Sequence, residues 1–151
     1  MLPAMRFAFL VLILSACGRS GAEDSGEREG ACGEPSEVDL TLKVAVHDSD
    51  GIGLQDINVD LEDRGWTNSA LGGGVTDEDG EVEFVASGVT DLPNCWGTLL
   101  DYVVVATDSQ GQWRTGEKSA NSYLYTAIDD ASMEADMRAF PVVMEPVEEE
   151  R

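Results

Sequence analysis

A regular alternation of apolar and polar residues from Val38 to Val46 constrains this chain more than any other feature of the sequence. Every second residue in this stretch is Val or Leu, and the residues between them are mostly polar. A period of two residues places the apolar side chains on one face of an extended strand. The pattern therefore predicts a strand that buries one face, as in a sheet, rather than an amphipathic helix.

Further segments share this strand-like pattern. They are residues 57–62, the hairpin-like pair 74–76 and 81–85, residues 99–107, which are apolar on both faces, and the shorter stretches 112–115 and 139–144. Pro141 places the last of these at a sheet edge, because proline cannot donate to a β-ladder. A short helical turn fits only within residues 127–138. About seven strands predict an all-β fold over residues 38–145, a single antiparallel Greek-key β-sandwich.

Three connections between these strands have the same form, Asp-x-x-Gly, at residues 48–51, 77–80 and 108–111. Asp at the first position accepts hydrogen bonds from backbone N–H groups of the turn, and Gly at the fourth tolerates a positive φ. If successive strands run antiparallel, these are the first, third and fifth connections. All three turns then lie at one end of the sandwich, and Cys32 and Cys95 lie at the other.

The acidic side chains of two of these turns suggest a metal site. Asp48, Asp50, Asp77 and Asp79 offer the carboxylate oxygens that calcium prefers. Neither turn is an EF-hand, because the spaced ligands and the glutamate at the twelfth position are missing. The four aspartates are either calcium ligands or turn formers on an acidic surface.

The first 16 residues have the form of a targeting signal, a lipoprotein signal peptide. Arg6 precedes eight apolar residues at positions 7–14, which span about 12 Å as a helix against roughly 30 Å for a bilayer core. The stretch ends in Leu-Ser-Ala-Cys at 14–17, which resembles the lipobox of bacterial lipoproteins. The resemblance implies cleavage after residue 16 and acylation of Cys17, which anchors the chain in the lipid bilayer. The alternative is an ordinary secretory signal.

The residue after Cys17 is Gly18 rather than Asp, which favours sorting to the outer membrane. We therefore expect a lipid-anchored protein of the cell envelope. Residues 17–37 comprise the lipidated cysteine and a polar, Gly-rich segment that we expect to be a flexible tether. Residues 146–151 form an acidic tail.

Two cysteines remain once Cys17 is assigned to the lipid anchor. Cys32 and Cys95 are an even number in an oxidising compartment, so we expect one disulfide between them, 63 positions apart. Free thiols and metal ligation are the alternatives. Two cysteines with one histidine, His47, make a poor zinc site.

The chain carries 30 acidic and 9 basic residues, for a formal charge of -21. This charge repels phosphates and anionic headgroups, so we expect no nucleic-acid partner and no docking on a membrane by charge. The only histidine, His47, falls on the polar face of the first strand, so we expect no enzyme activity and no cofactor beyond the candidate calcium. Five aromatic residues are candidates for stacking on sugar rings, for filling a partner's groove, or for packing within the domain: Trp66, Trp96, Trp113, Tyr123 and Tyr125.

A longer motif extends across residues 40–84. A strand is followed by Asp-Ser-Asp-Gly-Ile-Gly-Leu at 48–54, by Ile-Asn-Val-Asp-Leu at 57–61, and by Thr-Asp-Glu-Asp-Gly-Glu-Val-Glu-Phe at 76–84. This resembles the carboxypeptidase regulatory-like domain, a transthyretin-like β-sandwich of many bacterial surface proteins. Gly53 replaces the proline, and Val82 the aromatic residue, that the family prefers. The resemblance implies an accessory binding or structural module and not a catalytic one.

Together these features predict a membrane-anchored bacterial lipoprotein whose β-sandwich is a non-catalytic interaction or structural module of the cell envelope. Its expected partner is an envelope protein or glycan. One alternative is a lipoprotein subunit of a secretion or envelope assembly, which would co-purify with inner-membrane proteins. The other is a calcium-binding surface module.

Overall fold

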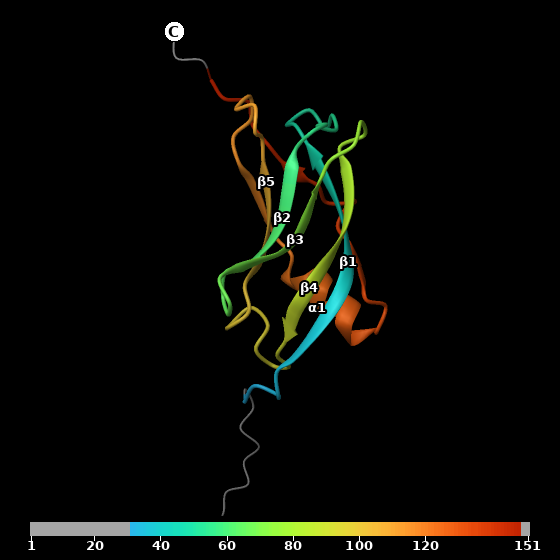
Figure 1. Cartoon of the computed structure of the whole chain (residues 1–151), viewed down its shortest axis with the longest axis vertical. Coiled ribbons are helices and arrows are strands. Elements are labelled where there is room, and N and C mark those ends of the chain that lie inside the picture. The colour runs from blue at the N-terminus through green and yellow to red at the C-terminus, as the bar shows by residue number, and fades with distance from the viewer. Residues whose placement is uncertain (1–30, 149–151) are drawn as a thin grey trace, which may run out of the picture.

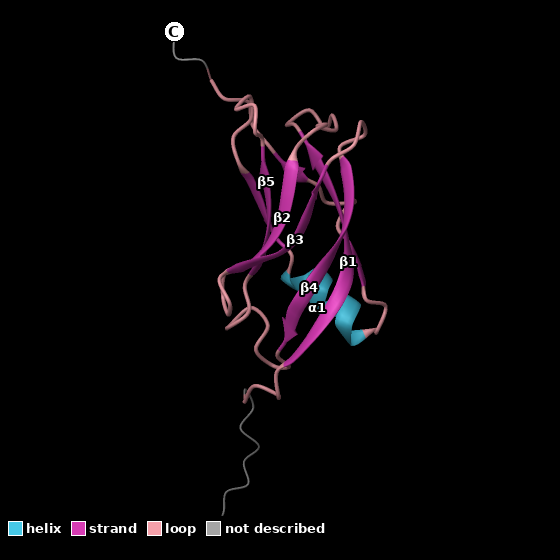
Figure 2. Cartoon of the chain, viewed as in Figure 1, coloured by secondary structure: helices cyan, strands magenta, loops and turns pink. Residues whose placement is uncertain are grey.

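Two four-stranded sheets pack against each other in an elongated domain. The computed structural model describes residues 31–148, which begin at one end of the long axis and finish towards the other (Figure 1). Strands dominate this part of the chain, and one short helix lies beside them (Figure 2). The elements are β1 (Ser36–His47), β2 (Asn58–Asp63), β3 (Ser69–Val75), β4 (Glu81–Asp91), β5 (Tyr102–Thr107), β6 (Gly116–Ser119), α1 (Asn121–Asp129), β7 (Glu134–Asp136) and β8 (Val142–Val143). The prediction of an all-β fold with two sheets is confirmed.

The first sheet is built around β1, with strand order β4-β1-β7 and with β8 also paired to β1. β4 runs antiparallel to β1, whereas β7 and β8 run parallel to it, beside residues 41–43 and 46–47. The prediction of an entirely antiparallel sandwich is therefore wrong at this edge. Parallel strands need a crossover connection. Here the chain leaves β6 in the other sheet and passes through α1 before it reaches β7.

The second sheet has the order β3-β2-β5-β6, and all of its pairs are antiparallel. The hairpin predicted from residues 74–76 and 81–85 is wrong, because β3 pairs with β2 and β4 pairs with β1. The turn at 77–80 instead carries the chain from one sheet to the other. The two strands approach each other closely across the sandwich, where a Cβ atom added to Gly74 would lie 2.7 Å from the Val82 side chain.

The alternating pattern of β1 forms the core as predicted. Leu40, Leu42, Val44 and Val46 are each at most 2% exposed, while Lys43 on the opposite face stays partly exposed. β5 is buried on both faces from residue 102 to 106, as expected for a central strand. Burial of these apolar side chains between the two sheets is the main favourable contribution to folding.

Two predicted strands near the C-terminus are shorter or displaced. Residues 112–115 form a loop, because the Asp108 carboxylate accepts hydrogen bonds from the backbone N–H groups of Gln110, Gln112 and Trp113. The strand begins only at Gly116. In the predicted strand 139–144, only residues 142–143 pair with β1.

The helix lies earlier in the chain than the sequence pattern indicated. α1 covers residues 121–129, whereas the predicted helical region was 127–138, and β7 occupies part of that region. Leu124 and Ala127 are the buried residues of α1, which packs beside β7. The contact with the sheet, rather than local sequence preference, stabilises this helix.

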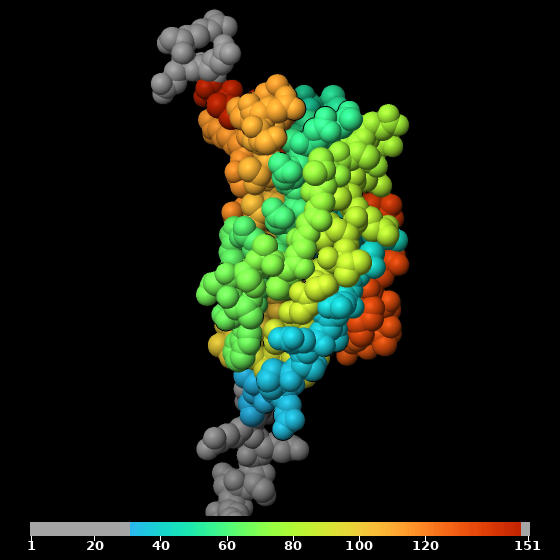
Figure 3. Space-filling view, viewed as in Figure 1, coloured from blue at the N-terminus to red at the C-terminus, as the bar shows by residue number. Residues whose placement is uncertain are grey.

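The domain begins before residue 38. Ser36 and Glu37, predicted to belong to the tether, pair with β4, and the backbone N–H of Gly33 donates to the carbonyl of Pro93 at 2.7 Å. In the space-filling view, this start of the chain, coloured blue, lies at the lower end of the domain (Figure 3). The predicted signal peptide 1–16, the candidate lipidation site Cys17, and residues 18–30 of the predicted tether lie outside the described residues.

The predicted acidic tail begins within the folded domain. The backbone N–H of Val147 donates to the carbonyl of Gln112 at 2.8 Å, and Pro146 forms a bridge with Trp113. These contacts hold the chain end against the loop that follows β5. Residues 149–151 lie outside the described part of the chain.

The three Asp-x-x-Gly turns lie at one end of the domain, as the alternation of strand directions predicted. In Figure 1 the loops that contain residues 48–51, 77–80 and 108–111 are all at the top, and the start of the described chain is at the bottom. The turns at 48–51 and 77–80 lie against each other, since the N–H of Val46, just before the first of them, donates to the Gly80 carbonyl at 2.8 Å.

Candidate binding site at the disulfide end

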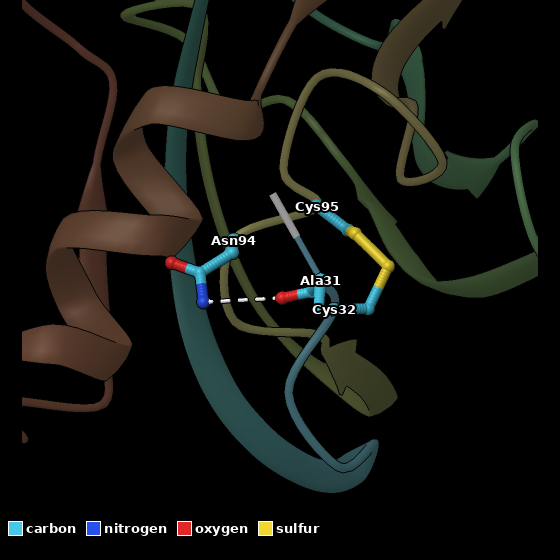
Figure 4. The surroundings of a disulfide bond; sticks show 4 residues. All are labelled: Ala31, Cys32, Asn94 and Cys95. Carbon is cyan, nitrogen blue, oxygen red and sulfur yellow. Dashed lines mark hydrogen bonds between the residues drawn. A yellow bond between two sulfur atoms is a disulfide. The ribbon is translucent and has the colours of Figure 1, made fainter. Parts of the chain in front are cut away.

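The disulfide between Cys32 and Cys95 fixes the start of the described chain to the loop after β4. The two Cα atoms lie 5.4 Å apart, and the predicted pairing is confirmed (Figure 4). Beside it, the side-chain amide of Asn94 donates to the carbonyl of Ala31 at 3.3 Å. The start of the described chain therefore lies against this loop.

The loop after β4 holds Trp96 in a defined orientation. Asn94 and Gly97 both adopt positive φ angles, and the Leu92 carbonyl accepts a hydrogen bond from the backbone N–H of Cys95. The indole N–H of Trp96 donates to the Asp91 carboxylate at 3.1 Å. The turn and this hydrogen bond place the Trp96 ring against Tyr102, with the ring centroids 5.6 Å apart.

Tyr125 of α1 completes an aromatic cluster with Trp96. Its ring meets the indole edge-on, with centroids 5.9 Å apart, yet Tyr125 remains 46% exposed. The position of α1 is set at its start by Asn121, whose side chain accepts from the Tyr102 N–H and donates to the Leu100 carbonyl. An aromatic ring is thus exposed at the surface beside Trp96.

Two hollows lie on either side of Tyr125. The aromatic hollow, of about 250 Å³, is lined by Trp96, Gly97, Asn121, Ser122 and Tyr125. The acidic hollow, of about 120 Å³, is lined by Asp91, Pro93, Asn94, Tyr125, Ile128 and Asp129. A ligand that contacts both hollows meets aromatic rings on one side and two carboxylates on the other.

The basic side chains of the described residues all have partners elsewhere in the chain. Arg64 pairs with Glu62 and Glu117, Arg138 with Asp136 and Glu81, Lys43 with Glu134 and Glu83, and Arg114 with Glu145, while Lys118 lies over the Phe140 ring. Two other hollows, around Arg64 and around Arg138, contain these ion pairs. Within residues 31–148, no basic side chain neutralises Asp91 or Asp129.

The aspartates considered for calcium have a structural role in their turns. The Asp48 carboxylate accepts from the N–H groups of residues 50 and 52, and the Asp77 carboxylate accepts from those of residues 79 and 81. Asp50 and Asp79 are exposed. No group of three or more metal-ligating side chains occurs in the part of the chain that the structure describes.

The remaining sequence candidates lie apart from the two hollows. Trp66 is 48% exposed in the β2–β3 connection, and Trp113 and Tyr123 are partly buried against the core. His47 is half-buried at the end of β1, on the face of the sheet that carries Lys43. Only Trp96 and Tyr125 of the five aromatic candidates meet at one surface.

Sequence reasoning missed the polar residues around these two rings. Asp91, Asn94, Ser122 and Asp129 belong to no motif, and α1 was not placed at residues 121–129. Only the aromatic composition pointed towards this surface.

Neither the protein-family models nor the curated proteins include a match to this chain. None of the helical residues within 31–148 forms a helix long and apolar enough to cross a membrane.

Proposed function

We propose that this protein is a lipid-anchored, non-catalytic recognition module of the bacterial cell envelope, with an envelope protein or glycan as its partner. The observation that carries the proposal is the exposed Tyr125 ring between two hollows at the end where the chain enters. A concave surface with aromatic walls and a few polar groups is typical of a binding site. Trp96 and Asn121, which flank it, are held by hydrogen bonds, so the surface is formed before a partner arrives.

The lipobox-like sequence at residues 14–17 supports the membrane anchor. In this proposal the signal peptide of residues 1–16 is removed and Cys17 carries the acyl chains in the outer membrane. Cys17 precedes Cys32 by 15 positions, which span at most about 50 Å of extended chain. Because Cys32 is joined to the loop that carries Trp96, the binding surface stays within that distance of the bilayer.

The proposal extends to the fold family, a transthyretin-like Greek-key sandwich of the carboxypeptidase regulatory-like type. Both Asp-x-x-Gly turns of the motif are formed, with Asp48 and Asp77 accepting hydrogen bonds from their own turns. This kind of domain is an accessory module, which agrees with a role in recognition. The turn geometry and the two-sheet architecture are the support for this assignment.

A second candidate function is a subunit of a secretion or envelope assembly. It is favoured by exposed apolar side chains at the other end of β1, where Ile52 is 64% and Val143 is 52% exposed. Val143 pairs with His47, and Ile52 precedes Gly53, which bridges to the same residue. An assembly subunit would use this second surface in addition to the hollows.

The anchor and the partner are tested in one preparation. The full chain is expressed in a Gram-negative bacterium, and the membrane fraction is analysed by intact-mass spectrometry and by native electrophoresis. We expect a mass that begins at an acylated Cys17 and a native complex larger than the protein alone. Cys17→Ser abolishes the acylation. Tyr125→Ala leaves the acylation of Cys17 intact but abolishes the native complex. A water-soluble, unacylated chain contradicts the anchor, and a complex unaffected by Tyr125→Ala contradicts the binding surface.

A further inference from the structure

The negative charge of the acidic hollow beside Tyr125 is not paired with any lysine or arginine of residues 31–148. Asp91 and Asp129 line it together with the Tyr125 ring. All five basic side chains of residues 31–148 have partners elsewhere, in four sets of ion pairs and one contact with Phe140. Two carboxylates next to an exposed aromatic face attract a cation, because the face of the ring is negative as well.

The size of the acidic hollow restricts the cation. A volume of about 120 Å³ holds several water molecules, since a site for one needs only about 10–15 Å³. This space suits the head group of a lysine or arginine side chain. The aromatic hollow on the other side of Tyr125, with about 250 Å³, suits a neighbouring apolar side chain.

We propose that the two hollows bind a basic segment of a partner protein, with one lysine or arginine in the acidic hollow and an adjacent apolar side chain against Trp96. This inference rests on the proposed recognition function and names the chemistry of its partner. The guanidinium or ammonium group lies over Tyr125 and pairs with Asp91 and Asp129. Charge complementarity selects this occupant, because the whole chain carries 30 acidic and only 9 basic residues, which steers basic partners towards it.

Binding of a synthetic peptide to the full chain, purified from membranes in neutral detergent, tests this inference. The probe is acetyl-Gly-Leu-Arg-Leu-Gly-amide, and the matched control peptide has neutral citrulline in place of arginine. The readout is the indole N–H resonance of Trp96 in a two-dimensional NMR spectrum, assigned with Trp96→Phe. We expect the arginine peptide to shift this resonance and to bind about five- to tenfold more tightly than the citrulline peptide.

Substitutions of residues that line the acidic hollow test where the arginine peptide binds. Asp129→Asn weakens arginine-peptide binding about three- to tenfold, and Tyr125→Ala weakens it by a similar factor. Asp50→Asn is the matched control, because it removes the same charge from an exposed position at the opposite end of the domain. Each of these variants changes only an exposed side chain. Thermal unfolding of each variant establishes that its domain is folded.

Several results would overturn the inference. Equal affinity for the two peptides excludes a cation site. If Asp129→Asn and Asp50→Asn weaken arginine-peptide binding equally, the effect comes from the net charge of the protein and not from this hollow. A shift of Trp96 by N,N′-diacetylchitobiose but not by the arginine peptide assigns the surface to a glycan. Tighter peptide binding in Arg28→Ala shows that the hollow belongs to the chain's own tether. None of these results bears on the acylated mass, so this inference fails separately from the membrane anchor.

Discussion

The hydroxyl group of Tyr102 makes two hydrogen bonds to the backbone of Thr90, accepting from its N–H at 2.8 Å and donating to its carbonyl at 3.2 Å. Tyr102 begins β5 in one sheet, and Thr90 lies near the end of β4 in the other, so one side chain joins the two sheets. Both residues are at most 2% exposed. Burial raises the pKa of Tyr102, which keeps the hydroxyl protonated and able to donate.

Removal of this hydroxyl destabilises the domain. Tyr102→Phe leaves the buried N–H and carbonyl of Thr90 without their side-chain partner, and we expect a loss of about 1–3 kcal/mol in the free energy of unfolding. The measurement is equilibrium urea denaturation of the full chain. Tyr123→Phe is the control, because the Tyr123 hydroxyl makes no hydrogen bond within residues 31–148. Equal losses in the two variants would show that the link between the sheets contributes nothing.

The disulfide stabilises the folded domain by restricting the unfolded chain. Its ends are 63 positions apart, for which the loop-entropy relation gives about 4 kcal/mol. We expect the double variant Cys32→Ala/Cys95→Ala to lose about this amount in urea denaturation. Dithiothreitol should destabilise the unsubstituted protein and leave the double variant unchanged. A double variant as stable as the oxidised protein would contradict the entropic role of the bridge.

Some features of the fold follow directly from local sequence. The period of two residues in β1 identifies its buried face because the strand runs through the core without a break. The disulfide could be predicted because Cys32 and Cys95 are the only cysteines left once Cys17 is set aside. The shared end of the three Asp-x-x-Gly turns followed from strand direction, and the crossover to β7 comes after the last of them.

The candidate site could not be predicted in the same way, because it depends on α1. This helix has nine residues and no side-chain hydrogen bond at its N-cap, Ala120. Tyr123, Tyr125 and Thr126 favour strands over helices. The helix is stabilised by the burial of Leu124 and Ala127 in the core between the sheets, which local sequence preference does not report. The contact between Tyr125 and Trp96 therefore could not be predicted from a sequence pattern.

The ion pair between Arg138 and Asp136 makes a prediction about pH. Arg138 donates to the Asp136 carboxylate at 2.7 and 3.0 Å and lowers the pKa of that carboxyl from 3.8 to about 2. A carboxyl with a lowered pKa stabilises the folded state at higher pH, and that contribution is lost as the pH falls from about 4 towards 2. The pair is about 40% exposed, so screening by solvent keeps its contribution to stability small.

Titration by NMR of the side-chain carboxyl carbon of Asp136 measures this effect directly. Arg138→Gln should raise the pKa of Asp136 from about 2 towards 3.8, because the charged donor is removed. Arg114→Gln is the control, since Arg114 reaches Glu145 only at 4.0 Å. An Asp136 pKa that is the same in Arg138→Gln and in the unsubstituted protein would assign the shift to backbone groups instead.

Gly53 lies where the backbone leaves no room for a side chain. A Cβ atom on Gly53 would lie 2.0 Å from the carbonyl oxygen of Asp79, because the turns at 48–51 and 77–80 are packed together. A Cβ atom on Gly80 would lie 2.6 Å from the carbonyl oxygen of Val46. Both glycines therefore allow the two turns to touch.

Substitution of Gly53 tests this close packing of the two turns. Gly53→Ala should lower the free energy of unfolding by about 2–3 kcal/mol, because backbone atoms must move apart to admit the methyl group. The control is Gly111→Ala in the third Asp-x-x-Gly turn, where φ is +73° but no atom lies within 4 Å of the added Cβ. There we expect only the cost of a left-handed backbone, about 1 kcal/mol. If urea denaturation shows equal losses for the two variants, the turns at 48–51 and 77–80 are not packed as described.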